Sequence, residues 1–342
     1  MPSPRVVVSD PIDELVRQGE LASNPRSPLG RRRQREAKPE PREIQPQRAR
    51  RVVRSRVEVV RADGWEAWPW LVHGFSTRTG GVTTAYGRGQ RSGELNLGFT
   101  PSDLRENVLE NRRRFLTALG VPAEMQLVTL KQIHSSSVLS AGEHDLSDGS
   151  ACQGDGLITN QPGTLLAIQT ADCIPVLVAD VKKKAIGAFH AGWRGTVKRI
   201  VENGVGKMRV AFRSRPEDLV AAIGPGIAAC CYAVGEEVRI EFNSQFSYAA
   251  DLFHEVSDLD PVKEKYPMLF LTARAPGHSE LGPSLHLDLM EANRRQLVDA
   301  GVRPEAITVV GDCTRCQNNR YFSYRAEQGH TGRMLSVIGI RG

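Results

Sequence analysis

Three side chains of types that bind metals each lie at the end of an apolar run. They are His134, Cys173 thirty-nine residues later, and His190 seventeen residues after that. If these runs are strands of one fold, the three side chains can meet in space. One thiolate and two neutral imidazoles suit zinc, and three protein ligands leave one coordination position for water or substrate. The sequence therefore predicts a metal site that does chemistry.

Copper is disfavoured by the residues around this ligand set. Blue copper centres use the same three ligands and add a weak axial methionine close in the sequence. Here the first methionine after Cys173 is Met208. A multicopper centre needs many imidazoles, typically in His-X-His pairs, and none of the eight histidines forms such a pair. We therefore predict Zn²⁺ as the cofactor.

Two charged residues adjoin the predicted ligands. Asp172 precedes Cys173, and Arg194 follows His190 by four residues. The same residues permit a different chemistry, in which Cys173 is a nucleophile and His190 its base, as in a cysteine hydrolase or amidase. The non-enzymatic alternative is a binding protein with a structural zinc. Three ligands speak against that alternative, because a structural zinc site normally has four.

Two of the remaining cysteines belong to a weaker pattern. His278 and Glu280, followed by Cys313 and Cys316, imitate the signature of zinc nucleobase deaminases. Glycines and prolines around His278 predict a loop where that signature needs a helix start, and Asp312 replaces the proline before the first cysteine. We therefore disfavour this signature and interpret Cys313 and Cys316 as buried thiols.

The sequence says less about three further residues. Cys230 and Cys231 are adjacent, which is too crowded for a ligand pair, so we predict that they belong to the core. Arg325 lies near the C-terminus, where both a pocket position and a surface position fit the sequence.

Apolar runs and turns predict the elements that position these residues. Strands are expected over 68–75, 126–130, 164–168, 174–179, 185–189, 219–223 and 307–310, and helices over 103–119, 195–205 and 289–297. The charged turn 182–184 predicts a hairpin that brings His190 opposite the Cys173 end of the partner strand. Strands and helices alternate without a repeat, so we expect one α+β domain with mixed β-sheets flanked by helices.

Basic residues are concentrated at the N-terminus. Residues 1–56 hold 14 of the 45 lysines and arginines and 7 of the 39 acidic residues, which leaves 31 basic against 32 acidic residues in 57–342. We predict a disordered basic tail over 1–56 and a catalytic domain over 57–342. An arm that contacts nucleic acid or anionic lipid is the alternative for the tail. The domain itself has no charge excess that would favour nucleic acid.

The cellular compartment is predicted from the absence of secretory, membrane-spanning and disulfide patterns. No apolar run has the length of a secretory signal or a membrane span. The six cysteines show no spacing typical of a disulfide scaffold. We therefore predict reduced thiols in a cytoplasmic protein that does not enter a membrane.

Eight short segments occur in an order typical of one family. They are TRTGG at 77–81, LNLG at 95–98, KQIH at 131–134, DGLIT at 155–159, TADCIP at 170–175, HAGWRG at 190–195, IGPGI at 223–227 and FSYR at 322–325. Through them, residues 65–341 resemble the laccase-domain or polyphenol oxidase family, which includes the peptidoglycan editing factor and purine nucleoside phosphorylases. The resemblance implies a single domain like that of the cytotoxic-necrotizing-factor-like cysteine hydrolases, with one zinc on His134, Cys173 and His190.

The resemblance also implies an activity. It points to phosphorolysis of adenosine, inosine, guanosine and S-methyl-5′-thioadenosine, with adenosine deamination as a further reaction, in a monomer whose partners are purine nucleosides and phosphate. Bacterial relatives are also linked to the editing of peptidoglycan precursors, which keeps the cysteine hydrolase as the alternative.

These reactions suggest roles for further residues. Phosphorolysis needs cations for phosphate, for which Arg78 and Arg194 are the candidates, and Asn96 is the candidate for ribose or base. Deamination needs an activated water, whose proton Asp172 could relay.

Overall fold

The computed structural model of the chain describes residues 56–87, 93–142, 152–256 and 284–342. The predicted tail, apart from Arg56, and the His278 segment lie outside these ranges, so the division at residue 56 stays a prediction. The described residues form two large β-sheets, a two-stranded sheet and five α-helices. The predicted mixture of helices and mixed sheets is thereby confirmed, while the likeness to cytotoxic-necrotizing-factor-like hydrolases stays a prediction.

The first large sheet has five strands. Their order is β1 (Val59–Val60), β2 (Leu71–Ser76), β14 (Met334–Ile340), β7 (Thr164–Thr170) and β4 (Gln126–Val128). Neighbouring strands are antiparallel except β4 and β7, which are parallel. Helix α2 (Arg105–Leu119) packs its Phe115 and Leu119 on this sheet, and it also contacts β3 (Thr79–Thr83). It ends at Gly120, whose φ of 69° favours glycine, so the predicted helix is confirmed.

The second large sheet has six strands. Their order is β13 (Ile307–Val309), β10 (Leu219–Ile223), β8 (Ile174–Asp180), β9 (Ala185–Ala191), β6 (Gly156–Thr159) and β5 (Val138–Ser140). Every residue of β8 and β9 is buried, which explains why both are continuous apolar runs in the sequence.

Helices cover the outer face of this second sheet. They are α3 (Trp193–Val197), α4 (Ile200–Phe212) and α8 (Leu289–Asp299), and α5 (Glu236–Gln245) packs on α3. The single helix predicted over 195–205 is two helices, because the chain turns at Arg199, whose φ is 60°. Helix α8 begins as predicted, with the Asp288 side chain accepting a hydrogen bond from the backbone N–H of Glu291.

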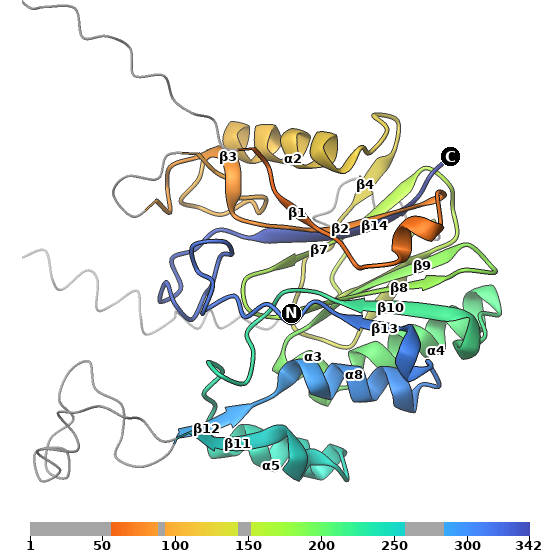
Figure 1. Ribbon diagram of the computed structural model, residues 1–342, viewed down its shortest axis with the longest axis vertical. Helices are drawn as coiled ribbons and strands as arrows, with labels where there is room; N and C mark the ends of the chain where they lie inside the picture. Colours follow the sequence, from red (N-terminus) through yellow and green to blue (C-terminus); the bar gives the residue numbers. More distant parts are fainter. Residues whose placement is uncertain (1–55, 88–92, 143–151, 257–283) are drawn as a thin grey trace, which may run out of the picture. The chain divides into compact units, whose positions relative to one another are not determined.

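The two large sheets stack face to face. Leu166 and Ile338 of the first sheet pack with Leu177 and Ala188 of the second in one buried cluster. Figure 1 shows the resulting order of layers, with α2 on one side of the stacked sheets and α4 and α8 on the other. The core between the sheets is aliphatic, and each fully buried leucine contributes about 1.5–3 kcal/mol relative to an exposed one.

Smaller elements complete the described part of the chain. The two-stranded sheet consists of β11 (Phe253–Val256) and β12 (Ser284–Leu287), and 3-10 helices span Trp65–Ala67, Pro216–Asp218, Ala249–Leu252 and Pro304–Ala306. None of the helices in the described ranges is both long and apolar enough to cross a lipid bilayer.

The strand topology gathers the predicted ligands at one edge of the stacked sheets. Because β4 and β7 are parallel, both end at the same edge, and from each the chain crosses to the second sheet. The β4–β5 connection carries His134, and the β7–β8 connection carries Cys173. Strand β9 is antiparallel to β8 and β6, so its end, with His190, lies beside the starts of both.

Candidate active site

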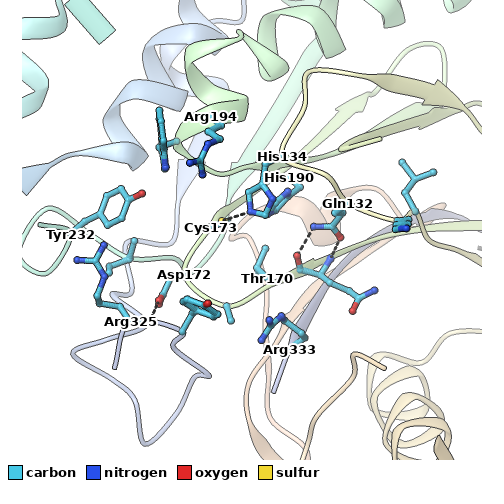
Figure 2. A pocket seen from close by; sticks show the side chains of 17 residues that line it. Gln132, His134, Thr170, Asp172, Cys173, His190, Arg194, Tyr232, Arg325 and Arg333 are labelled. Atoms are coloured by element: carbon cyan, nitrogen blue, oxygen red, sulfur yellow. Dashed lines mark hydrogen bonds between the residues drawn. The ribbon is translucent and has the colours of Figure 1, made fainter. Parts of the chain in front are cut away.

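The three predicted ligands converge in the structure. Their candidate donor atoms all lie within 4.8 Å of one another, and Cys173 Sγ is 4.0 Å from His134 Nε2. Figure 2 shows the two side chains facing each other beside His190. Pro175 pairs with His190 in the β8–β9 hairpin, so the predicted hairpin is confirmed. A Cβ on Gly192 would lie 2.9 Å from Cys173 Sγ, which explains the glycine at this position.

The loop that carries His134 is fixed on two sides. The Gln132 side chain donates to and accepts from the backbone of Gln169 on β7, both at 2.8 Å (Figure 2). On the other side, the Asp155 carboxylate accepts from the backbone N–H groups of His134 at 3.0 Å and Ser135 at 2.6 Å. His134 has a φ of 56°, a strained conformation for histidine that these contacts stabilise.

Asp155, for which the sequence predicted no role, also orients His190. Its Oδ1 accepts a hydrogen bond from His190 Nδ1 at 2.8 Å, and both side chains are buried. This bond leaves the Nε2 lone pair of His190 available as a donor. Carboxylates commonly support metal-ligating histidines in this way. In the sequence, Asp155 could have been noticed because it directly precedes the strand 156–159 and begins the segment DGLIT at 155–159.

The charges of the site are coupled. Burial favours a neutral Cys173 thiol, but the charge of His190 and hydrogen bonds from His134 and His190 outweigh it and lower the pKa of Cys173 to about 6. Burial also opposes a charge on His190, but the Cys173 thiolate and the bond to Asp155 raise the pKa of His190 to about 9. Without a metal, a thiolate therefore lies beside an imidazolium at neutral pH.

These residues fit a tetrahedral metal ion with one open position. A thiolate and two imidazole nitrogens bonded at about 2.0–2.3 Å to one zinc lie less than about 4 Å from each other, close to the separations found here. The thiolate is already the favoured form of Cys173. His190 must give up a proton to bind, so metal binding should release protons near neutral pH.

The lowered pKa of Cys173 predicts how this thiol reacts in chelator-treated protein. Only the thiolate is alkylated, so the rate should reach half its maximum near pH 6. An ordinary cysteine reaches it near about pH 8.5. Peptide mass spectrometry after iodoacetamide treatment measures the rate at Cys173 and, for comparison, at Cys152. Added zinc should protect Cys173 but not Cys152, which belongs to neither group of candidate ligands. A midpoint above pH 8 would contradict the coupled charges.

A cavity of about 650 Å³ opens beside the metal ligands. Its wall includes four cationic side chains, of Lys131, Arg194, Arg325 and Arg333, against the single carboxylate of Asp172. Trp193, Tyr232 and Tyr324 add aromatic surface. Net positive charge and aromatic faces suit a ligand that combines an anion with a flat ring.

The arginines of the cavity are held by different contacts. The Arg194 guanidinium lies 4.4 Å above the Trp193 ring at the start of α3. Arg325 donates to the backbone oxygen of Ala233 at 2.8 Å and lies 5.4 Å from the Tyr232 ring centroid. The structure therefore places the predicted Arg194 on the cavity wall, and of the two positions open to Arg325 it selects the pocket (Figure 2).

Asp172 lines the cavity beside Cys173, but both of its oxygens are engaged. Oδ1 accepts from the Thr314 hydroxyl at 2.6 Å and Oδ2 from the backbone N–H of Arg325 at 2.7 Å. The residue has a φ of 89°, unusual for any residue other than glycine. These contacts suit a residue that positions the Arg325 segment, while the proton relay predicted for Asp172 stays a prediction.

Arg78 lies elsewhere, away from the residues that line the cavity. It is 4% exposed, and its guanidinium pairs with Glu94 at 2.7 Å and Glu327 at 3.0 Å and stacks on Phe322. Its donors are used inside the fold. These contacts give the predicted substrate role of Arg78 no support, and that role stays a prediction.

Asn96 is likewise absent from the cavity wall. It is fully buried, and its amide donates to Gly98 O at 3.0 Å and to Asp103 Oδ2 at 2.8 Å. Its Oδ1 accepts from the backbone N–H of Arg333 at 2.8 Å. Asn96 therefore holds the backbone of Arg333, a residue of the cavity wall. Its predicted contact with ribose or base stays a prediction.

The interpretation of the other cysteines also changes. Cys230, Cys231, Cys313 and Cys316 form one cluster. Cys313 is buried as predicted, but Cys316 and Cys230 are exposed and Cys231 is half-buried, so their assignment to the interior is wrong. The pairing that brings them together joins segments more than eighty residues apart and is invisible in local sequence.

Comparisons with known proteins identify the family of the chain. The family model described as multi-copper polyphenol oxidoreductase laccase matches residues 72–341. "Purine nucleoside phosphorylase YlmD" of Geobacillus stearothermophilus is 35% identical over 288 residues, covering 81% of this chain and 96% of that protein. "Purine nucleoside phosphorylase" of Deinococcus radiodurans is 40% identical over 268 residues, covering 78% and 88%.

Solved structures show the same similarity. The crystal structure of Bacillus licheniformis YfiH aligns with a TM-score of 0.66 at 29% identity, covering 81% of this chain and 95% of that one. The crystal structure of Geobacillus stearothermophilus YlmD aligns with a TM-score of 0.64 at 32% identity, covering 80% and 93%. Since the family model spans most of the sequence, the chain belongs to the multi-copper polyphenol oxidoreductase laccase family.

Proposed function

We propose that the protein is a zinc-dependent purine nucleoside phosphorylase. Its substrates would be adenosine, inosine, guanosine, S-methyl-5′-thioadenosine and phosphate, with adenosine deamination as a further activity. The names of the similar proteins support the proposal. The observation that carries it is the cavity, which combines four cationic side chains and three aromatic rings beside a three-ligand metal site.

Phosphorolysis sets two demands on the site. A phosphate oxygen forms a bond to C1′ of the nucleoside, and the bond from C1′ to N9 of the purine breaks. The departing purine keeps the electron pair, so it needs a proton or a positive partner, and the entering phosphate needs cations. Arg194 and Lys131 on the cavity wall can bind phosphate.

Aromatic residues of the cavity are suited to the purine. Trp193, Tyr232 and Tyr324 present faces on which a flat base can stack. Burial and the negative charge of Cys173 raise the pKa of Tyr232, so its phenol stays protonated. Tyr232 can therefore donate a hydrogen bond to the leaving base.

His134, Cys173 and His190 would hold the zinc ion. When bound, zinc would supply a Lewis acid for phosphorolysis, and it would lower the pKa of a bound water for deamination. Asp155 orients the His190 ring through Nδ1 and fixes the His134 backbone through its N–H. Asp172 holds the Arg325 segment against the same cavity.

Arg194→Ala tests the phosphate site. Loss of a charge-assisted hydrogen bond costs about 1.5–3 kcal/mol, so the KM for phosphate should rise by about ten-fold to a hundred-fold. The KM for nucleoside should change much less. Arg215→Ala is the matched control, because Arg215 pairs with Glu217 at the surface and does not line the cavity. An unchanged phosphate KM in Arg194→Ala would remove Arg194 from this role.

One observation favours a second candidate, the cysteine hydrolase that edits peptidoglycan precursors. Asp155, His190 and Cys173 are linked in series, as in enzymes where a carboxylate orients the base of a nucleophile. Metal removal separates the two candidates. A zinc phosphorylase loses activity with chelator and regains it with zinc, whereas a cysteine hydrolase works without metal and forms an acyl-enzyme at Cys173 that mass spectrometry detects.

The proposal extends to the state of the protein in the cell. We propose a monomer in the cytoplasm, with no nucleic-acid or membrane partner for residues 57–342. Analytical ultracentrifugation of the full chain tests the monomer.

A further inference from the structure

A group of four thiols lies apart from the ligands of the proposed active-site zinc. The sulfurs of Cys230, Cys231, Cys313 and Cys316 all lie within 4.8 Å of one another. Cys316 Sγ is 3.5 Å from Cys230 Sγ and 3.4 Å from Cys231 Sγ. Four sulfurs bonded to one tetrahedral ion at about 2.3 Å are about 3.8 Å apart. The spacing is therefore that of a site for one ion, and it is longer than the ~2.05 Å of a disulfide bond. It argues against the expectation that the adjacent Cys230 and Cys231 are too crowded to be a ligand pair.

The fold brings the two pairs of cysteines together. Strands β10 and β13 are parallel neighbours, so the segments that follow them leave the sheet at the same edge. The first segment contains Cys230 and Cys231, and the second contains Cys313 and Cys316. Gly226 N donates to Asp312 O at 3.2 Å, and Thr314 N donates to Gly226 O at 2.9 Å. The backbone thus fixes one segment against the other.

The surroundings of Cys313 favour a thiolate. The Ala228 N–H donates to Cys313 Sγ at 3.5 Å. Burial opposes a charge there, but this bond and those from the N–H groups of Cys316 and Arg315 lower the pKa of Cys313. Backbone N–H groups directed at the first sulfur of a C-x-x-C turn are what a metal-bound thiolate requires.

The other thiols lie against one another, with Cys316 Sγ close to the sulfurs of both Cys230 and Cys231. A divalent cation among the four sulfurs stabilises each thiolate and releases the thiol protons to solvent.

We propose that Cys230, Cys231, Cys313 and Cys316 bind a second zinc ion in a closed, tetrahedral, four-thiolate site. Four protein ligands leave no position for substrate, so this ion is structural, in contrast to the three-ligand site at Cys173. The two segments that it joins carry Ile227, Tyr232, Tyr324 and Arg325 of the cavity wall. The second zinc therefore fixes one side of the cavity.

Metal analysis of the full chain, purified reduced and without added metal, tests this site. Wild-type protein should contain about two zinc ions per chain, and Cys173→Ser about one. The double variant Cys230→Ser, Cys316→Ser should also contain about one, with Cys173 still protected by it from alkylation. Cys152→Ser, outside both clusters, should keep two. A zinc content that the double variant leaves at the wild-type value would overturn the proposal.

Two measurements keep the test decisive if the double variant does not fold. Cys316→His supplies another zinc ligand and should retain the ion that Cys316→Ser loses. Cobalt substituted into Cys173→Ser should show strong thiolate-to-metal charge-transfer absorption, because every ligand of the remaining site is a thiolate. Absence of that absorption, or a disulfide within the cluster in protein isolated with its metals, would also overturn the four-thiolate site.

The experiment also distinguishes which metal ion the four thiols bind. Iron in place of zinc, found in the wild type by elemental analysis, would keep the four-thiolate site and contradict its assignment to zinc. Failure of the second site leaves the phosphorylase proposal untouched, because the two ligand sets share no residue.

Discussion

Cys173→Ser is expected to lower kcat/KM for adenosine phosphorolysis by a factor on the order of 10³ and to remove one zinc per chain. A serine hydroxyl stays protonated at neutral pH, so the site loses its only anionic ligand. It also loses the charge that raises the pKa of His190. Steady-state kinetics and elemental analysis on the same preparation measure both effects.

The matched control is Cys152→Ser, which changes another partly exposed thiol outside both thiol-containing ligand groups. It should keep activity and metal content, and equal melting temperatures of the two variants would show that a loss at Cys173 is local. Full phosphorolysis by Cys173→Ser with its zinc gone would refute the zinc-dependent scheme.

Asp155→Asn is expected to reduce zinc affinity or activity by about ten-fold to a hundred-fold with the fold preserved. The carboxylate accepts bonds on both oxygens, from His190 on one and from Ser135 on the other. An amide has only one acceptor oxygen, so its NH₂ group must face an N–H donor in either orientation. The His190 ring or the His134 loop then loses its support.

A second readout separates positioning from general structural damage. Asp155 raises the pKa of His190, so its loss weakens the imidazolium that stabilises the Cys173 thiolate. The alkylation midpoint of Cys173 in metal-free Asp155→Asn should therefore move above pH 6. Asp218→Asn, before the start of β10 and away from the cavity, should leave it unchanged. An unshifted midpoint with normal zinc affinity would assign Asp155 no role in the site.

Much of the centre of the site could be predicted because its ligands adjoin local patterns. The apolar runs of β8 and β9 and the charged turn between them specify a hairpin, and that hairpin alone sets His190 beside the start of the strand after Cys173. Predicting the position of His134 requires one further fact, the parallel pairing of β4 with β7, which cannot be deduced from the sequence.

The residues whose roles local patterns do not reveal depend on long-range contacts. Asp155 meets His190 only because β6 pairs with β9. Arg78 has the residue type of a phosphate ligand, but buried carboxylates of Glu94 and Glu327 engage it inside the fold. Cys231 and Cys313 belong to one cluster because β10 and β13 are neighbours. Residue type and local spacing do not predict which distant strands or side chains will be neighbours in the fold.

The central claim is that a metal at Cys173 supports phosphorolysis of purine nucleosides. The most direct measurement incubates full-length protein of known zinc content with adenosine, with and without phosphate, before and after chelation, and separates the products by chromatography. The account predicts adenine and ribose 1-phosphate only when phosphate and zinc are both present, and inosine from deamination when zinc is present without phosphate. Unchanged adenosine in every sample, with Cys173 freely alkylated in zinc-supplemented protein, would contradict it.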